Sequence, residues 1–475
     1  GEERIIRAVE PTRTVYKLVR QSIAGMGGIT LSCNAPLGVL EPRAFDLIDM
    51  GSTFLAEGEA NRYGVTIEAV SRYFSALKDD GLLSLPVATA DFPAYGEKLL
   101  TTVDQSLRRN GVDDPGKHVL VYRSGSGARI LVSRKGFSDK AIAALQTFCR
   151  ERFFDISWHS GIDRNKISIL HGLSAAGLTD RNKIRADQTD ALRDAALNLF
   201  QTPAVGSSAS VFNLDPATLD RPFFHAVFPV GKISALLSTR SGLPRYEIGQ
   251  LINAIVLILA LIAGAFVMLL PLFRKKEPGE NLSRPRTVVY FACLGLGIVF
   301  ITLVLAERCA FFLNDTATAV AVVVSAMCFF SGCGSARASK LDPLSDRGIK
   351  WAVVRIITCL VLYIFLLTPV LSVLIPLSSL IKVATILIVT APVAFTAGLP
   401  LPLGLSCLRE RTSFFLPWAF GIYIIFFVIA FPLGRLLAVA WGLHVLLFIA
   451  VFLYFIALWA YPAMLPGAAT KENAC

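Results

Sequence analysis

The chain has 475 residues, of which 54% are hydrophobic and 17% are charged. Soluble globular chains carry about 25% charged residues, so this composition excludes an ordinary soluble enzyme and also a disordered chain. The net charge of +11 could indicate nucleic-acid binding, but the basic residues form no single arm and many of them flank long apolar runs. We therefore expect the lipid bilayer as a partner and expect no nucleic acid.

Charged residues recur every few positions up to about Arg245, which is typical of a water-exposed domain. Ile5–Val9 is predicted to form a buried parallel strand with Glu10 at its carboxyl end. The elements predicted next are a helix over Thr14–Ile23, a strand over Asp46–Ile48, a helix over Thr66–Lys78 closed by Asp79-Asp80-Gly81, and a strand over Leu82–Leu85. This alternation of strands and helices indicates an α/β sheet.

Two β-rich runs, His118–Tyr122 and Arg129–Ser133, are predicted to form a hairpin. The glycines between them could suggest a phosphate-binding loop, but such a loop needs a helix directly after it and here a strand follows. Ser138–Arg152, with Ser138 as its N-cap, and Asp187–Phe200 are predicted to be amphipathic helices of a layer appended to the sheet.

From Leu251 onward the sequence consists of long apolar runs, seven of which are long enough to cross a bilayer at about 20 residues per crossing. The predicted spans are Leu251–Leu272, Val288–Leu305, Ala317–Cys333, Trp351–Leu374, Val383–Leu401, Phe414–Val439 and Gly442–Tyr461. Pro392, Gly398, Pro400 and Pro402 interrupt the fifth span, so we expect a broken or re-entrant element there.

The predicted organisation has five parts. They are an α/β domain over 1–135, an appended helical region over 136–228, a linker over 229–249, a transmembrane helical domain over 250–462 and a tail over 463–475.

The loop charges predict an orientation in the membrane. The loops after the first, third and fifth spans hold eleven basic residues, against three (Arg308, Lys382 and Arg435) for the loops between them. The eleven are Arg274, Lys275, Lys276, Arg284, Arg286, Arg337, Lys340, Arg347, Lys350, Arg409 and Arg411. Because basic loops stay in the cytoplasm, we expect a multi-pass protein of the cell inner membrane whose N-terminal half is extracytoplasmic.

The spans contain few polar residues of the kind that line a transport pathway. Glu307 and Arg308 adjoin at a helix end and are expected to lie at the membrane interface. Arg355 and Arg435 lie close enough to span ends to snorkel, and His444 is expected to be an interfacial or helix-bonded imidazole. The small residues of Ser331–Ser335 predict close helix packing at a span end. A transporter is therefore the least favoured function.

No catalytic or metal-binding constellation is predicted. His118, His159, His171 and His225 lack metal-ligand spacing, and no Ser or Cys lies in a nucleophile-elbow pattern. Six of the nine cysteines fall in or beside apolar runs, where a thiol behaves as a small hydrophobe: Cys293, Cys309, Cys328, Cys333, Cys359 and Cys407. Asp46 and Asp49 are interpreted as loop or capping acids, because an offset of three places them on opposite faces of a strand.

Several segments together resemble one protein family. In the N-terminal half they are Ile5–Glu10, Glu41–Arg43, Phe45–Ile48, Thr66–Ala69, Leu77–Leu83 and Asp220–Phe224, and in the apolar half they are Tyr290–Gly297, Phe330–Ser335, Gly398–Leu405 and Pro417–Gly421. These segments resemble the membrane-fused spermidine synthase-like proteins, which have an S-adenosylmethionine-type Rossmann domain. The resemblance implies a Rossmann-like α/β domain, truncated at its start, followed by an all-α transmembrane domain of about seven helices.

The resemblance also implies site residues. Glu10 matches the acid that binds the ribose of S-adenosylmethionine or a related nucleoside, and Glu41 matches an acid near the adenine. The glycine-rich first loop of the family, expected just before Ile5, is absent from the sequence, and the spacing between Arg43 and Asp46 is shorter than in the family. Where aminopropyltransferases carry Asp-Ser-Ser-Asp, this chain has Gly51-Ser52-Thr53-Phe54, which lacks the acid that would deprotonate an amine.

These departures predict a degenerate, non-catalytic domain in an accessory or assembly subunit of a membrane complex, with other membrane subunits as partners. The alternative is a membrane-bound methyltransferase or aminopropyltransferase-like enzyme that uses S-adenosylmethionine. Methyl transfer needs mainly the alignment of donor and acceptor, so the missing acid would not abolish it.

Overall fold

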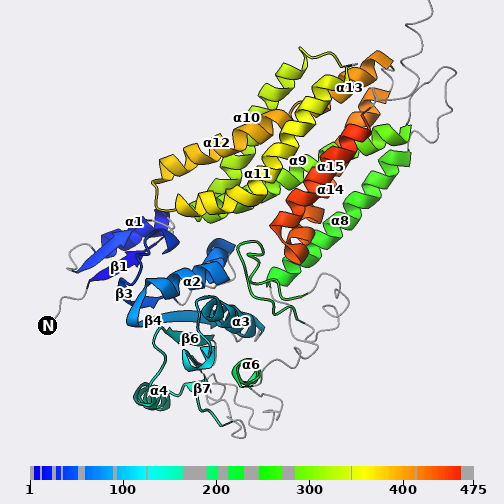
Figure 1. The fold of residues 1–475 in the computed structure, drawn as a ribbon. Coiled ribbons are helices and arrows are strands. Elements are labelled where there is room, and N and C mark those ends of the chain that lie inside the picture. The colour runs from blue at the N-terminus through cyan, green and yellow to red at the C-terminus, as the bar shows by residue number, and fades with distance from the viewer. Residues whose placement is uncertain are drawn as a thin grey trace, which may run out of the picture. The chain divides into compact units, whose positions relative to one another are not determined.

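The structure is a computed structural model that describes residues 5–10, 13–23, 28–33, 36–51, 59–88, 94–124, 127–163, 190–201, 212–228, 245–269, 284–343, 345–411 and 415–461. The chain divides into two compact units, Gly1–Gly249 and Gln250–Cys475. The first unit contains strands and helices, and the second is helical (Figure 1).

The first unit contains two sheets (Figure 1). The smaller one pairs β1 (Ile6–Val9) with β2 (Ile29–Ser32) in parallel, and α1 (Arg13–Ser22) connects them. Parallel neighbours need such a crossover, since a tight turn can join only antiparallel strands. The parallel strand and the helix after it are therefore confirmed. The predicted burial of the strand is wrong, because Ile5 and Ile6 are exposed and no described element covers them.

The larger sheet has five strands in the order β3-β4-β6-β5-β7. Their bounds are Phe45–Asp49 for β3, Leu77–Ala88 for β4, Val119–Arg123 for β5, Gly127–Ser133 for β6 and Asp155–Trp158 for β7. β3 and β4 are parallel, whereas the other neighbours are antiparallel. The predicted hairpin is confirmed as β5 and β6, but β7 joins this sheet without having been predicted.

The helix α2 (Ile67–Ala76) joins β3 to β4, and Thr66 caps it by accepting a hydrogen bond of 3.3 Å from the Ala69 N–H. The predicted end of this helix at Asp79-Asp80-Gly81 is wrong, because β4 begins at Leu77 and pairs there with Phe45. The acids and Gly81 lie instead in an irregular part of β4. A Cβ on Gly81 would approach the Phe45 carbonyl oxygen to 2.9 Å, so the close strand contact requires glycine.

The main core of the unit lies between this sheet, α2 and α3 (Ala94–Arg109), a helix that the sequence analysis did not predict. Leu99, Val103 and Leu107 on α3 are fully buried against Leu83 and Leu85 of β4. The predicted appended helices are present as α4 (Asp139–Glu151), capped by Ser138, and α6 (Ala191–Phe200).

The segment Phe212–Phe228 covers α2 and α3. The buried Lys98 ammonium of α3 donates to the carbonyl oxygens of Phe223 at 3.2 Å and Ala226 at 2.8 Å. Glu68 of α2 accepts from the Leu219 N–H at 3.0 Å. This segment is thus part of the packed first unit.

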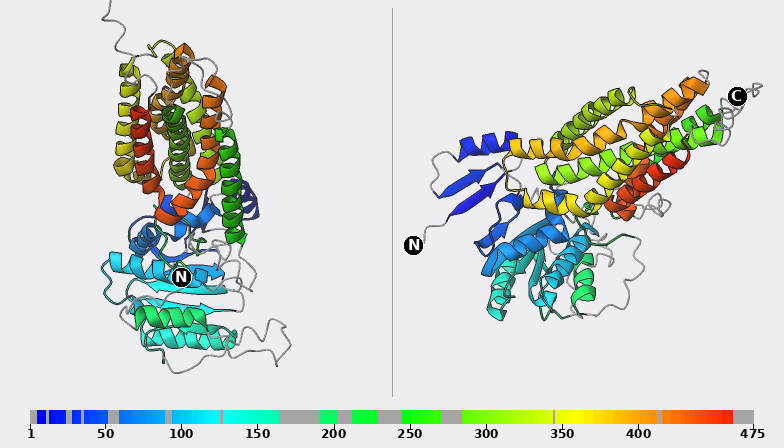
Figure 2. Two further views of the ribbon diagram at one scale, coloured as in Figure 1. Left: turned by 90° about the vertical axis from the view of Figure 1, so that its right-hand side faces the viewer. Right: turned by 45° about the horizontal axis from the view of Figure 1, so that its top comes forward.

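In the second unit the helices run side by side (Figure 2). Their bounds are Arg245–Leu269 for α8, Arg284–Leu313 for α9, Thr316–Ala338 for α10, Asp346–Val373 for α11, Ser379–Ala397 for α12, Pro400–Arg411 for α13, Leu416–Trp441 for α14 and Leu443–Trp459 for α15. Six helical stretches among the described residues are long and apolar enough to cross a membrane, and α15 is a shorter apolar helix of 17 residues. The chain is therefore a multi-pass membrane protein by helix length and composition.

The expected interruption of the fifth span is found at Gly398-Leu399, between α12 and α13. Pro392 lies within α12 without ending it. α9 is the most deeply buried of the candidate spans and packs against α10, α14 and α15. Gly295 of α9 lies so close to α14 that a Cβ would approach the Tyr423 carbonyl oxygen to 2.6 Å.

Candidate functional site

Glu10 lies directly after β1, at the carboxyl end of a parallel strand pair, as predicted. Its backbone N–H donates to the Ser32 carbonyl oxygen at the end of β2, at 3.1 Å. The carboxyl ends of parallel strands are where open α/β sheets bind ligands, so Glu10 stands at a position suited to a ligand contact.

Glu41 lies four residues before β3 begins, at the amino end of that strand, whereas Glu10 lies at the carboxyl end of β1. Its carboxylate forms an ion pair of 2.7 Å with the Arg7 guanidinium of β1, and that guanidinium also lies 5.7 Å from the centre of the Phe45 ring. Arg7 precedes Glu10 by three residues, about 10 Å along a strand, and their side chains leave opposite faces. The structure therefore pairs Glu41 with Arg7 and does not bring it beside Glu10.

A third acid, Asp49, forms a polar cluster at the carboxyl end of β3. The Arg129 guanidinium of β6 contacts the Asp49 carboxylate and also donates to the Ser84 hydroxyl of β4 at 2.6 Å. Asp49 was interpreted as a loop or capping acid, and instead it is the last residue of β3 and pairs with Arg129, whose guanidinium links β6 to β3 and β4. Its position directly after the apolar run of β3 was the sequence signal for this role. Gly51 lies just beyond, and Ser52–Phe54 are outside the described residues.

Buried acids of α3 have perturbed pKa values. Burial raises the pKa of Glu97, and the negative charge of Asp194 on α6 raises it further. Burial also raises the pKa of Asp104, although its ion pair of 3.0 Å with Arg108 acts in the opposite direction. Such shifts can mark functional sites, but these two acids are seven residues apart on one helix and form no pair.

The histidines of the first unit are not grouped. His118 Nδ1 lies 2.9 Å from the Ser133 carbonyl oxygen, whereas His225 is buried edge-on against Tyr95 and Phe224. Across the described ranges, no cluster of three or more His, Cys, Asp or Glu side chains could hold a metal ion. His171 lies outside these ranges.

Polar contacts join α9, α14 and α15 in the second unit. Glu307 of α9 pairs with Arg435 of α14 at 3.1 Å, and Arg308 of α9 lies 3.4 Å from His444 Nδ1 of α15. The sequence analysis placed Glu307 and Arg308 at a membrane interface and left Arg435 to snorkel. The structure buries Arg308 and places all four side chains in contacts between helices, which the sequence analysis did not predict.

No known protein family, curated protein or solved structure matches this chain.

Proposed function

We propose that this chain is an accessory or assembly subunit of a membrane complex, whose α/β unit is a degenerate, non-catalytic spermidine synthase-like domain. The six candidate spans support its place in a membrane. We further propose that the membrane is the cell inner membrane and that the partners are other membrane protein subunits.

The observation that carries the proposal is an exposed apolar edge formed by β1, α1 and β3. Ile6 of β1 is 53% exposed, Leu18 of α1 is 60% exposed and Leu47 of β3 is 56% exposed. Strands in parallel sheets are usually buried on both faces, so exposed apolar side chains on two of them indicate a missing covering element. β1 and β3 each pair on one side only among the described strands, which leaves two edges able to pair with an added strand.

The strand order supports a Rossmann-like domain. In the smaller sheet β2 pairs beside β1, and in the larger sheet β4 pairs beside β3. If the two sheets were joined through their β1 and β3 edges, successive strands would be added in opposite directions from that point. The strand order would then reverse between β1 and β3. The contacts of Arg7 with Glu41 and Phe45 join these two regions. One parallel strand between β1 and β3 would unite the sheets, with Glu10 at the point of reversal, where such sheets bind ligands.

The pairing of Glu41 supports the loss of catalysis. The Glu41 carboxylate forms an exposed ion pair with Arg7 at 2.7 Å. Gly51 stands where an aminopropyltransferase would carry the first acid of its Asp-Ser-Ser-Asp run. Amine attack on a sulfonium carbon requires a positioned base, and neither residue supplies one.

A second candidate function is the S-adenosylmethionine-dependent methyltransferase or aminopropyltransferase-like enzyme, and the position of Glu10 favours it. Such an enzyme would bind S-adenosylmethionine through Glu10, whereas an assembly subunit would contact its partner subunits through the exposed apolar edge.

The substitution Leu47→Asp distinguishes the two functions. The protein would be extracted from its native membrane in mild detergent and its associated subunits quantified. An assembly subunit co-purifies with other subunits at a fixed ratio, and Leu47→Asp abolishes this association. Phe153→Asp is the matched control, because Phe153 is 72% exposed on the same unit but lies away from the edge. A lone monomer contradicts the proposal, and calorimetric binding of S-adenosylmethionine that Glu10→Ala removes supports the enzyme.

The orientation is a further part of the proposal. Arg308, Lys382 and Arg435, the three basic residues counted against it, all lie within helices and contact other helices or aromatic rings. Seven of the eleven basic residues on the other side also lie within helices: Arg284, Arg286, Arg337, Arg347, Lys350, Arg409 and Arg411. The support for an extracytoplasmic N-terminal unit is therefore the count of eleven basic residues against three along the sequence. A compartment-sensitive reporter inserted in Thr239–Pro244 tests this orientation, and a cytoplasmic signal would overturn it.

A further inference from the structure

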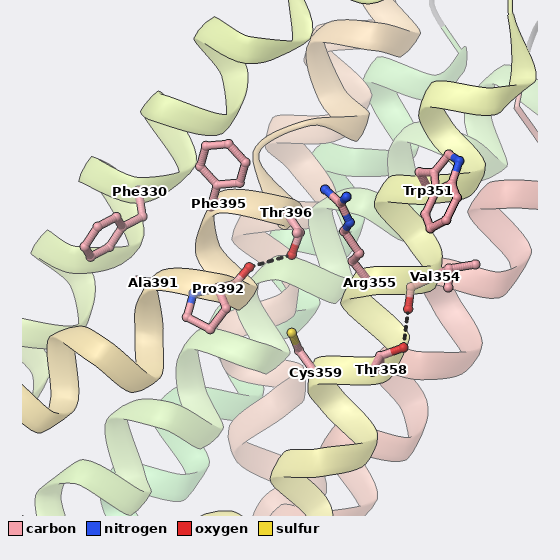
Figure 3. Close-up of a pocket in the computed structure, with 10 residues that line it drawn as sticks. All are labelled: Phe330, Trp351, Val354, Arg355, Thr358, Cys359, Ala391, Pro392, Phe395 and Thr396. Carbon is pink, nitrogen blue, oxygen red and sulfur yellow. Dashed lines mark hydrogen bonds between the residues drawn. The ribbon is translucent and has the colours of Figure 1, made fainter.

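A groove of about 730 Å³ lies between α10, α11 and α12 in the second unit. Figure 3 shows the side chains that line it. Phe330 comes from α10, Arg355 and Cys359 from α11, and Pro392 and Phe395 from α12. The groove is independent of the exposed edge and of the acids described above.

The groove is apolar except at Arg355. The hydroxyls of Thr358 and Thr396 each donate to a carbonyl oxygen of their own helix, at 2.9 and 2.8 Å, so neither needs a ligand. The Arg355 guanidinium extends toward Thr396 and Trp351 (Figure 3) and lies 5.8 Å from the centre of the Trp351 ring. No carboxylate in the described part of the chain lies within ion-pair distance of it. A charged group beside an apolar groove inside a span is costly, and pairing with an anion or extension to the membrane interface reduces that cost. Arg355 is exposed to the groove side and is therefore open to an anion.

The position of Arg355 along α11 fits the boundary between lipid headgroups and acyl chains. It lies eight residues after Arg347, about 12 Å along the helix. Arg347 and Lys350 at the start of α11, with Arg337 and Lys340 at the end of α10, form a basic rim at this end of the helices. By the loop charges this end faces the cytoplasmic leaflet, which is rich in anionic lipids.

We propose that the groove binds an anionic phospholipid. The lipid phosphate pairs with Arg355 below the basic rim, and an acyl chain lies against Phe330, Pro392 and Phe395. Trp351 flanks the headgroup region, where tryptophan is favoured in membrane proteins. Basic pockets between transmembrane helices are a common form of such lipid sites. An acyl chain uses the groove's apolar lining, which a free inorganic anion would leave uncovered.

Native mass spectrometry of the delipidated full-length protein tests the proposal. The probes are phosphatidylglycerol and phosphatidylcholine with identical acyl chains. We expect one phosphatidylglycerol to bind at least tenfold more tightly than phosphatidylcholine, and Arg355→Gln to abolish this preference. Arg355→Lys keeps the charge and should retain most of it. Arg347→Gln is the matched control, since it removes a nearby rim charge outside the groove lining.

The apolar part of the site has its own test. Ala391→Phe fills the groove and leaves Arg355 in place, so it should weaken phosphatidylglycerol binding at least tenfold. Equal binding of the two lipids would overturn the proposal, as would equal losses from Arg347→Gln and Arg355→Gln. Displacement of the lipid by millimolar inorganic phosphate would also overturn it, because the site would then recognise a free anion.

Discussion

Gly334 of α10 and Gly398, which follows α12, pack against each other's backbone. A Cβ on Gly334 would lie 3.4 Å from the Gly398 Cα and 2.0 Å from the Phe395 carbonyl oxygen. A Cβ on Gly398 would lie 2.1 Å from the Ser331 carbonyl oxygen. Glycines allow helix backbones to approach in membranes, where packing replaces the hydrophobic drive between helices. α10 and α12 are therefore joined at a point that admits no side chain.

Gly334→Ala should destabilise the membrane unit strongly. Overpacking costs about 1–3 kcal/mol where side chains can adjust, and here backbone atoms block the methyl group, so we expect at least about 3 kcal/mol. Thermal unfolding of the full chain in detergent would measure the loss. Gly332→Ala is the control two residues away, because no atom lies within 4 Å of a Cβ there. Equal stability of the two variants would contradict this packing.

Arg134 connects β6 to the end of α2. Its Nη1 donates to the carbonyl oxygens of Phe74, Ser75 and Leu77 at 3.1, 3.1 and 2.9 Å. The last carbonyl groups of a helix lack partners within it, and a charged donor there stabilises by about 1.5–3 kcal/mol.

Arg134→Met should therefore lower the unfolding free energy of the first unit by about 2 kcal/mol, since it keeps the aliphatic bulk and removes the donor. Urea unfolding of the full chain in detergent, followed by the reactivity of the buried Cys149, would measure this. Lys135→Met is the control, because its ion pair with Asp80 is exposed on both sides and should contribute less than about 1 kcal/mol. A smaller loss for Arg134→Met than for Lys135→Met would exclude the capping role.

Local signals in the sequence predicted local structure well. The N-cap Ser138 and the β5–β6 hairpin depend on residues a few positions apart, and each is confirmed. The start of β4 at Leu77 was missed because it depends on pairing with Phe45, 32 residues earlier. An acidic Asp-Asp-Gly run favours a helix end when considered alone, and the neighbouring strand overrides it.

The same distinction holds for the candidate site. The position of Glu10 after a strand follows from the local pattern of apolar residues. The partner of Glu41 is 34 residues away, and the partners of Glu307 and Arg308 are more than 100 residues away. Sequence spacing could not bring these groups together, so it predicted neither the helix contacts of Glu307 and Arg308 nor the pairing of Asp49 with Arg129.

Asp190 forms a buried ion pair that joins α6 to the sheet. Its carboxylate accepts from Arg123 of β5 at 2.8 Å and from the Ser157 hydroxyl of β7 at 2.7 Å, and its side chain is 1% exposed. Removal of one partner leaves an uncompensated buried charge, so Asp190→Asn should cost about 3–5 kcal/mol in the Cys149 unfolding assay.

An exposed pair provides the comparison for Asp190. Asp46 pairs with Lys78 at 2.7 Å but is 80% exposed, so Asp46→Asn should cost less than about 1 kcal/mol. Combining Asp190→Leu with Arg123→Met should recover much of the stability lost in Asp190→Asn, because no buried charge then remains. Failure of the double variant to exceed Asp190→Asn would show that packing, and not the unpaired charge, sets the cost.

Glu97 should make the first unit less stable as the pH rises. Burial, followed by the charge of Asp194, raises the pKa of Glu97 in the folded state above its value of about 4.3 in an unfolded chain. A folded pKa above the unfolded one means that the folded state binds the proton more tightly. The stabilisation is fully present below the unfolded pKa and is lost as the pH rises through the folded pKa.

Glu97→Gln should therefore raise the unfolding free energy at pH 7 and leave it nearly unchanged at pH 4, where the wild-type carboxyl is already largely neutral. The Cys149 assay at both pH values would measure the difference, with reaction times adjusted because the reactive thiolate fraction of an exposed cysteine, whose pKa is about 8.5, is much smaller at pH 4 than at pH 7. Glu151→Gln, on the exposed face of α4, should change neither value. A loss of stability at pH 7 in Glu97→Gln would mean that the ionised carboxylate is stabilised by its surroundings more than burial disfavours it.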